Sequence, residues 1–291
     1  MTETERTAPP APGIYYDVPM DVYRAWGAIN YSSISKGRKS MRAMHHAMTH
    51  SSKATAAQGL GTAVHAAILE PDMFEAFPVF DGTRRVKAFK TFEDENGCEC
   101  ITRDEKETAA RLALIVHEDV ESRHLVRASK HEVCMVWESP EYGLAKQRLD
   151  MLGNAFVADV KSARDVAIRE IEKAIHSPWG WGYYLQFGWA LEGLQNLGEN
   201  IGMYEGYLIA VETAGDVPDA YAARINKDLM LRGQADAVRI AKEYHTCFVL
   251  NHFYGVARDG VPEIAKPHWM QIEDGDGEKD LSTGTMGAAQ L

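Results

Sequence analysis

Residues 144–161 read LAKQRLDMLGNAFVADVK, two apolar runs joined by a Gly-Asn pair at 153–154. An acid, Asp150, closes the first run, and a second acid, Asp159, stands in the other run two residues before Lys161. Gly and Asn are typical turn residues, so we expect the runs to pair as a β-hairpin that brings the two acids together. Because side chains alternate along a strand, Asp159 and Lys161 share one face.

Two carboxylates beside a lysine are the groups that metal-dependent phosphodiester hydrolysis uses. Mg²⁺ prefers oxygen ligands and keeps several waters, so Asp150 and Asp159 suffice to hold it. The metal activates a water and neutralises charge on the phosphate, and Lys161 would orient that water or offset the charge. An acid at a strand end is often only part of a turn. However, Asp159 and Lys161 interrupt an apolar strand whose packing has no use for them, which favours a metal site.

The surrounding pattern predicts an α/β or α+β core, with a central mixed β-sheet flanked by helices. Residues 131–138 alternate and are rich in Val, Met and Trp, so we expect an antiparallel meander with strands at 144–152 and 155–160. Two more strands are expected at 204–213 and 220–226. Helices are expected at 58–69, 104–120, 166–175, 181–197 and 229–251, with another after serine N-cap candidates at 32–35, and residues 81–102 are expected to be a long loop.

The chain is expected to hold one folded domain. Residues 1–13 are polar and proline-rich and predict a disordered lead, residues 14–271 predict the domain, and the glycine-rich residues 272–291 predict a flexible tail. The sequence has no run of 18 apolar residues and no apolar segment near its start, so neither a membrane span nor a secretory signal is expected. We therefore expect a cytoplasmic protein.

The net charge of −11 restricts how the chain could bind nucleic acid. DNA binding rests on Lys and Arg side chains that neutralise phosphates, so the acidic total argues against a broad basic surface but leaves room for a local groove. Lys36, Arg38, Lys39 and Arg42 form a local basic cluster. It is either a solvated helix face or a contact to the DNA backbone.

Four cysteines, Cys98, Cys100, Cys134 and Cys247, are expected to be reduced in the cytoplasm. An iron–sulfur cluster would need the four thiolates to converge. The first two lie in a polar stretch and the other two in apolar runs, which favours free thiols over a cluster.

Two further polar residues lie on predicted helices. His65 follows Gly-Thr-Ala-Val at 61–64, and Gln186 stands in the aromatic stretch 183–190. A lone helical histidine is usually a packed or surface residue, an aromatic stripe is usually core, and a glutamine within it could be a satisfied buried amide. Neither residue indicates a site when taken alone.

Taken in their order, these motifs resemble the PD-(D/E)XK nuclease superfamily. Within it, the chain is similar to the nuclease domain of exodeoxyribonuclease VIII (RecE), the exonuclease of prophages, and to its phage relatives. The resemblance covers residues 14–270 and implies a restriction-endonuclease-like core. The residues that carry it are Gly61-Thr62-Ala63-x-His65, Leu69-Glu70-Pro71, Arg148-x-Asp150, Asp159-Val160-Lys161 and Gln186.

The resemblance implies a role for each residue of the site. His65, Asp150 and Asp159 would be ligands of Mg²⁺, with Mn²⁺ as a substitute, and the carbonyl of Val160 would be an additional ligand. Lys161 would orient the attacking water or stabilise the transition state. The catalytic set would be Asp150, Asp159, Lys161 and Gln186, with Gln186 helping to set the site.

Two motif residues have roles that the resemblance leaves open. Glu70 is either part of the site or a buried structural carboxylate, and Arg148 could pair with an acid or with a phosphate. Asp159 and Ser162 stand where the superfamily often has Glu and Thr, and Leu149 stands where a proline often precedes the first acid. The exodeoxyribonuclease VIII type also tolerates Asp at the second acid.

The implied activity is the degradation of linear double-stranded DNA from its ends, 5′ to 3′, which exposes single strands for recombination. The resemblance also implies a ring-like homo-oligomer in a bacterial host cell, with a RecT-like single-strand annealing protein as partner. One alternative is a Cas4-like or endonucleolytic member, although the chain lacks the C-terminal cysteine set of the iron–sulfur relatives. The other is a non-catalytic DNA-binding relative, against which the intact set of His65, Asp150, Asp159 and Lys161 argues.

Overall fold

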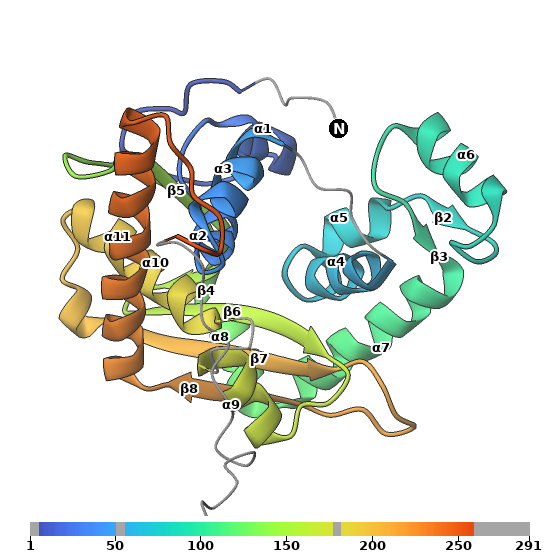
Figure 1. The fold of residues 1–291 in the computed structure, drawn as a ribbon. Coiled ribbons are helices and arrows are strands. Elements are labelled where there is room, and N and C mark those ends of the chain that lie inside the picture. Colours follow the sequence, from blue (N-terminus) through green and yellow to red (C-terminus); the bar gives the residue numbers. More distant parts are fainter. Residues whose placement is uncertain (1–5, 51–55, 177–181, 259–291) are drawn as a thin grey trace, which may run out of the picture. The chain divides into compact units, whose positions relative to one another are not determined.

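The computed structural model describes residues 6–50, 56–176 and 182–258 (Figure 1). All the elements described below lie within Met1–Val256. The predicted tail at 272–291 lies outside the described residues. The strands are β1 (Gly13–Tyr15), β2 (Val79–Phe80), β3 (Ile101–Thr102), β4 (Ser129–Ser139), β5 (Gly143–Gly153), β6 (Phe156–Ala163), β7 (Glu205–Glu212) and β8 (Ala220–Ile225).

The helices occupy both halves of the described chain. None of the described helices combines the length and the apolar character that crossing a bilayer requires. The helices are α1 (Met20–Ala25), α2 (Tyr31–Gly37), α3 (Met41–Thr49), α4 (Ala56–Leu69), α5 (Pro71–Ala76), α6 (Lys87–Asn96), α7 (Arg103–Glu118), α8 (Val120–Arg127), α9 (Ile168–His176), α10 (Tyr183–Asn196), the 3₁₀ helix η1 (Ile201–Met203) and α11 (Lys227–Val249).

A six-stranded mixed sheet forms the centre of the fold, in the order β1-β4-β5-β6-β7-β8. Strands β4, β5 and β6 are the predicted antiparallel meander, while β6 and β7 pair in parallel and β8 returns antiparallel. A parallel pair needs a crossover between its strands, and α9 and α10 provide it. The predicted fold class, a mixed sheet flanked by helices, is confirmed.

Side chains alternate between two apolar layers, one on each face of the sheet. On β7, Leu208 and Ala210 pack in the layer that contains α10 and α11, whereas Ile209 and Val211 pack in the layer that contains α4 and α7. Strand periodicity explains this, because consecutive side chains point to opposite faces. The sheet therefore presents different residues to α4 and to α10.

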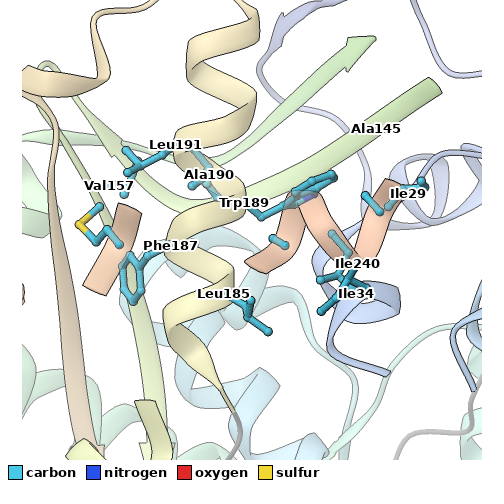
Figure 2. Close-up of a cluster of buried hydrophobic side chains, with 14 of the residues drawn as sticks. Ile29, Ile34, Ala145, Val157, Leu185, Phe187, Trp189, Ala190, Leu191 and Ile240 are labelled. Atoms are coloured by element: carbon cyan, nitrogen blue, oxygen red, sulfur yellow. The ribbon is translucent and has the colours of Figure 1, made fainter. Parts of the chain in front are cut away.

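Helix α10 runs through the middle of the larger layer. Leu185, Trp189 and Leu191 are fully buried, and Figure 2 shows them among apolar side chains of the sheet, α2 and α11. α10 crosses α11 at Gly188 and Gly233, where a Cβ on either glycine would run into the backbone of the other helix. These two glycines let the helices approach closely and fix α10 over the sheet.

Two predictions about local structure are wrong. The serines at 32–35 lie inside α2; Asn30 is the N-cap, because its side chain accepts from the Ser33 N–H at 2.9 Å while the Ser33 hydroxyl accepts from the Asn30 N–H. The expected long loop at 81–102 contains α6, which buries Phe89 and ends at Gly97, where φ is 63°. Within the predicted lead, residues 1–13, Thr7 forms an isolated bridge with Trp26.

Candidate active site

The site lies where strands β5 and β6 separate. The described ladder between them ends at the pair Met151–Ala158, so Asp150 and Asp159 are the next residues on the two diverging strands. Asp150 Oδ2 accepts a hydrogen bond from the Val160 N–H at 2.9 Å. A carboxylate thus takes a backbone donor at the point where the two strands stop pairing.

Helix α4 brings His65 to this point. Ala63 and Val64 are fully buried in the layer between α4 and the sheet, and the neighbouring His65 faces two acids. His65 Nε2 lies 2.8 Å from Asp150 Oδ2, and Nδ1 lies 3.1 Å from Glu132 Oε1. The imidazole therefore joins two carboxylates, one at each ring nitrogen.

Glu132 on β4 is the residue of this site that the sequence analysis missed. It is 7% exposed, and its second oxygen pairs with the Arg148 guanidinium. Its φ of 54° lies in the left-handed region, which costs a non-glycine residue about 1–3 kcal/mol and persists only where the surroundings enforce it. One signal marks it in the sequence: like Asp159, it is an acid beside an apolar run. Of the two partners expected for Arg148, the structure shows an acid.

Asp159, Lys161 and Gln186 meet on the α10 side of the sheet. Val160, between the acid and the lysine, is buried in the opposite layer, as alternation predicts. Asp159 Oδ1 accepts from Gln186 Nε2 at 2.5 Å, and Oδ2 pairs with the Lys161 ammonium. Lys161 Nζ also lies 5.0 Å from the centre of the Tyr183 ring. Helix α10 thus contributes both a hydrogen-bond donor and an aromatic wall.

His65 and Asp150 form a charged pair. Burial alone would lower the pKa of His65, but the carboxylates of Asp150 and Glu132 outweigh it and raise that pKa to about 9. Burial alone would raise the pKa of Asp150, but His65 and Lys161 hold it below its ordinary range. At neutral pH the imidazolium therefore supplies positive charge between two acids.

The pKa values of Asp159 and Lys161 are shifted by burial and by each other's charge. Burial and the Asp150 carboxylate raise the pKa of Asp159 to about 7. Burial alone would lower the pKa of Lys161, but Asp159 and Asp150 keep it above its ordinary value, so its ammonium stays charged. Two buried carboxylates that repel each other are a place where positive charge is stabilising.

The donor set fits a divalent cation. Within residues 6–50, 56–176 and 182–258, the ligand atoms of His65, Glu132 and Asp150 all lie within 4.8 Å of one another. Carboxylate oxygens and an imidazole nitrogen are atoms that divalent cations bind in proteins. A cavity of about 10 Å³, which is room for one water-sized particle, borders Asp150, Asp159 and Gln186.

The structure divides the predicted site residues into two adjoining groups. His65 and Asp150 are in direct contact, while Asp159 is held by Lys161 and Gln186. Val160 contributes its N–H to Asp150, and the use of its carbonyl as a ligand stays a prediction.

The other residues that the sequence analysis singled out, namely Glu70, the basic cluster and the cysteines, take no part in the contacts described above. Glu70 is half-buried at the start of α5, where it is the N-cap residue. Arg38 of the basic cluster lies against Gly182, just before α10, and the other three basic residues are exposed. The four cysteines are free thiols; one is exposed and three are buried. A DNA contact by the basic cluster stays a prediction.

No model of a known protein family matches the sequence, and no curated protein matches it. Among solved structures, a protein from Eubacterium rectale described as a "putative exonuclease" has a similar fold, with a TM-score of 0.58 and 11% sequence identity over 90% of this chain and 100% of that chain. The crystal structure of SSO0001 aligns over 65% of this chain and 87% of that chain, at 14% identity and a TM-score of 0.25. The second likeness is too low to carry an argument, and the first shows a shared fold.

Proposed function

We propose that this chain is a divalent-metal-dependent exodeoxyribonuclease that degrades linear double-stranded DNA. The observation that carries the proposal is the meeting of His65, Asp150, Asp159 and Lys161 where two strands of the sheet separate. The fold shared with the Eubacterium rectale protein supports it. Mg²⁺ is the proposed cofactor because three of the four proposed donors, Asp150, Asp159 and the carbonyl of Val160, are oxygens. Mn²⁺ is the alternative because the fourth donor, a histidine nitrogen, suits a transition metal better.

The contacts suggest how the residues divide the work. A divalent cation, when bound, neutralises charge on the phosphate and lowers the pKa of a water. His65, Asp150 and Asp159, with the carbonyl of Val160, would hold it. Lys161 stays charged at neutral pH and would stabilise the negative charge that develops on the phosphate.

The test of this proposal is the digestion of end-labelled linear duplex DNA beside a covalently closed circle of the same sequence. We expect the linear duplex to be degraded with Mg²⁺ or Mn²⁺, to survive in EDTA, and to be degraded again after Mg²⁺ is restored. The circle is expected to survive, because an exonuclease needs an end. Cutting of the circle would support the endonucleolytic alternative instead. Blocking each end in turn reads the polarity, for which we expect 5′ to 3′.

Substitutions assign the activity to the site. Asp159→Ala is expected to abolish degradation while circular dichroism and the melting temperature show a folded protein. Gln186→Ala, which removes the hydrogen bond to Asp159, is expected to lower the rate without abolishing it. Asp228→Ala, an exposed acid at the start of α11, is the matched control and should retain full activity. Full activity in Asp159→Ala would refute the site.

We also propose a ring-like homo-oligomer and a RecT-like annealing partner, on the basis of the family resemblance. A ring is compatible with the net charge of −11, because basic residues then need only line the channel that the DNA passes through. Light scattering of the purified chain measures the oligomer, and a monomer at micromolar concentration would contradict the ring.

A further inference from the structure

We propose that Glu132 and Arg148 are positioning residues for His65. Glu132 determines which imidazole nitrogen faces Asp150, and Arg148 holds Glu132 in place. This inference rests on the proposed metal site, and it adds to that site two residues from strands β4 and β5.

The directions of the two ring nitrogens give the first part of the argument. A single cation can bind only one nitrogen of a histidine, because the two lone-pair directions diverge. Nε2 of His65 faces Asp150 at 2.8 Å, so Nε2 is the nitrogen on the metal side. Nδ1 faces Glu132 at 3.1 Å. In metal sites, a histidine commonly donates its second N–H to a carboxylate, which fixes both the tautomer and the ring orientation.

Both oxygens of Glu132 are already engaged, which argues for positioning rather than for direct ligation. Oε1 is opposite His65, and Oε2 pairs with Arg148 Nε. Binding a cation through Glu132 would require it to release one of these partners. The side chains of Glu132 and Arg148 are only 9% and 10% exposed, so water competes little for either contact.

The support for Glu132 extends to the N-terminal segment. Arg148 Nη1 donates to the carbonyl of Val18 at 2.5 Å and also contacts Cys134 Sγ at 3.7 Å. The guanidinium is thus held at two places besides the Glu132 carboxylate. The left-handed φ of 54° at Glu132 directs this strand residue into the same cluster. A continuous set of contacts therefore links Val18, Arg148, Glu132 and His65.

The test is a calorimetric titration with Mn²⁺ of the full chain and of Glu132→Gln. The amide keeps the shape of the side chain but removes the charge that holds the Nδ1 proton. We expect the Kd for Mn²⁺ to rise about 10–100-fold, in the range seen when such supporting residues are lost. Nuclease activity should return at raised metal concentration, because the ligands themselves are intact.

The matched control is Glu105→Gln. Glu105 pairs with Arg84 at 2.6 Å, and their side chains are 16% and 17% exposed. This variant therefore loses the charge of an Arg–Glu pair of similar burial that lies outside the site. We expect its Kd for Mn²⁺ to equal that of the unsubstituted chain. If both variants weaken metal binding equally, the effect is a general loss of stability and the proposal is overturned.

Nitrogen NMR of the histidines in saturating Mg²⁺ gives a readout that a purely structural role would not move. In the unsubstituted chain, His65 should show a protonated Nδ1 and an unprotonated Nε2. In Glu132→Gln this single tautomer should be lost. If Glu132→Gln does not fold, Glu132→Asp replaces it. Asp tolerates the left-handed backbone and withdraws the carboxylate by one methylene, so the same weakening of Mn²⁺ binding is expected.

The outcomes separate this inference from the proposed function. An unchanged Kd and tautomer in folded Glu132→Gln would overturn the positioning role, even if the chain is a nuclease. Tight Mn²⁺ binding that depends on Glu132, without any DNA degradation, would overturn the nuclease and leave the positioning role standing. A chain that binds neither Mn²⁺ nor Mg²⁺ would overturn both.

Discussion

Replacing Gly233 with alanine is expected to force helices α10 and α11 apart and to destabilise the fold. A Cβ built on Gly233 would lie 2.7 Å from the carbonyl carbon of Tyr184 and closer still to its oxygen, whereas ordinary contact begins at 3.4 Å. The helices must therefore separate by at least about 0.7 Å, because backbone atoms, unlike a side chain, cannot rotate away from the contact in a densely packed interior.

Two opposing terms set the size of the effect. Overpacking a core costs about 1–3 kcal/mol, and a clash with backbone belongs at the upper end of that range. Alanine gains about 1 kcal/mol over glycine in a helix interior. We therefore expect Gly233→Ala to lower the free energy of unfolding by about 2 kcal/mol. The proposed DNA degradation should slow as well, because α10 also carries Gln186.

Urea unfolding followed by circular dichroism measures this change as a lower midpoint at an unchanged slope. Gly188→Ala, on the facing helix, should cost a similar amount, and the double variant should cost less than the sum, because both residues press on one crossing. Gly255→Ala is the control, since its nearest neighbour would be 3.6 Å away. A stability of Gly233→Ala equal to or above that of the unsubstituted chain would refute the close crossing.

Three further predictions concern single side chains. Burial lowers the pKa of Lys146 from 10.5 to about 7. Between these pH values the unfolded chain binds a proton at Lys146 that the folded chain does not, so the free energy of unfolding rises with pH from 7 to 10.5. The urea midpoint of Lys146→Met should therefore rise less over this pH range than that of the unsubstituted chain. Asp119→Ala removes the cap that accepts from Ser122 N–H at 2.8 Å and should cost about 1 kcal/mol in urea unfolding. Tyr142→Phe removes the hydroxyl that accepts a 3.0 Å hydrogen bond from the Trp137 indole N–H, and it should lower the free energy of unfolding by about 1–3 kcal/mol. Tyr16→Phe, at an exposed tyrosine, is the control and should leave that free energy unchanged.

The parts of the fold that follow from local patterning were predictable. The meander could be predicted because turn residues separate the strands at 131–138, 144–152 and 155–160. The helix at 229–251 could be predicted because its apolar residues recur at helical spacing. The loop predicted at 81–102 was wrong because α6 is short and buries little more than Phe89. A helix with so little apolar surface leaves a weak periodic signal.

The site was predictable only in part, because some of its residues depend on tertiary geometry. Asp159 and Lys161 were legible because they interrupt an apolar strand. Glu132 is also an acid beside an apolar run, but its direction could not be predicted, because a left-handed backbone at that residue sets it and strand alternation does not reveal this. The partner of Arg148 was likewise open: Arg148 is paired in the β4–β5 ladder with Cys134, and the sequence does not show that its side chain reaches Glu132, two residues away along β4.

The separation of the site residues along the chain has a consequence for the order in which the site assembles during folding. The meander β4–β5–β6 joins neighbours along the chain, whereas His65 and Gln186 reach it from distant segments. Contacts between distant segments form later, because they carry a larger loop-closure cost. We expect a newly made chain to hold Asp150 and Asp159 together before His65 and Gln186 reach them, so that the candidate site is complete only at the last step of folding.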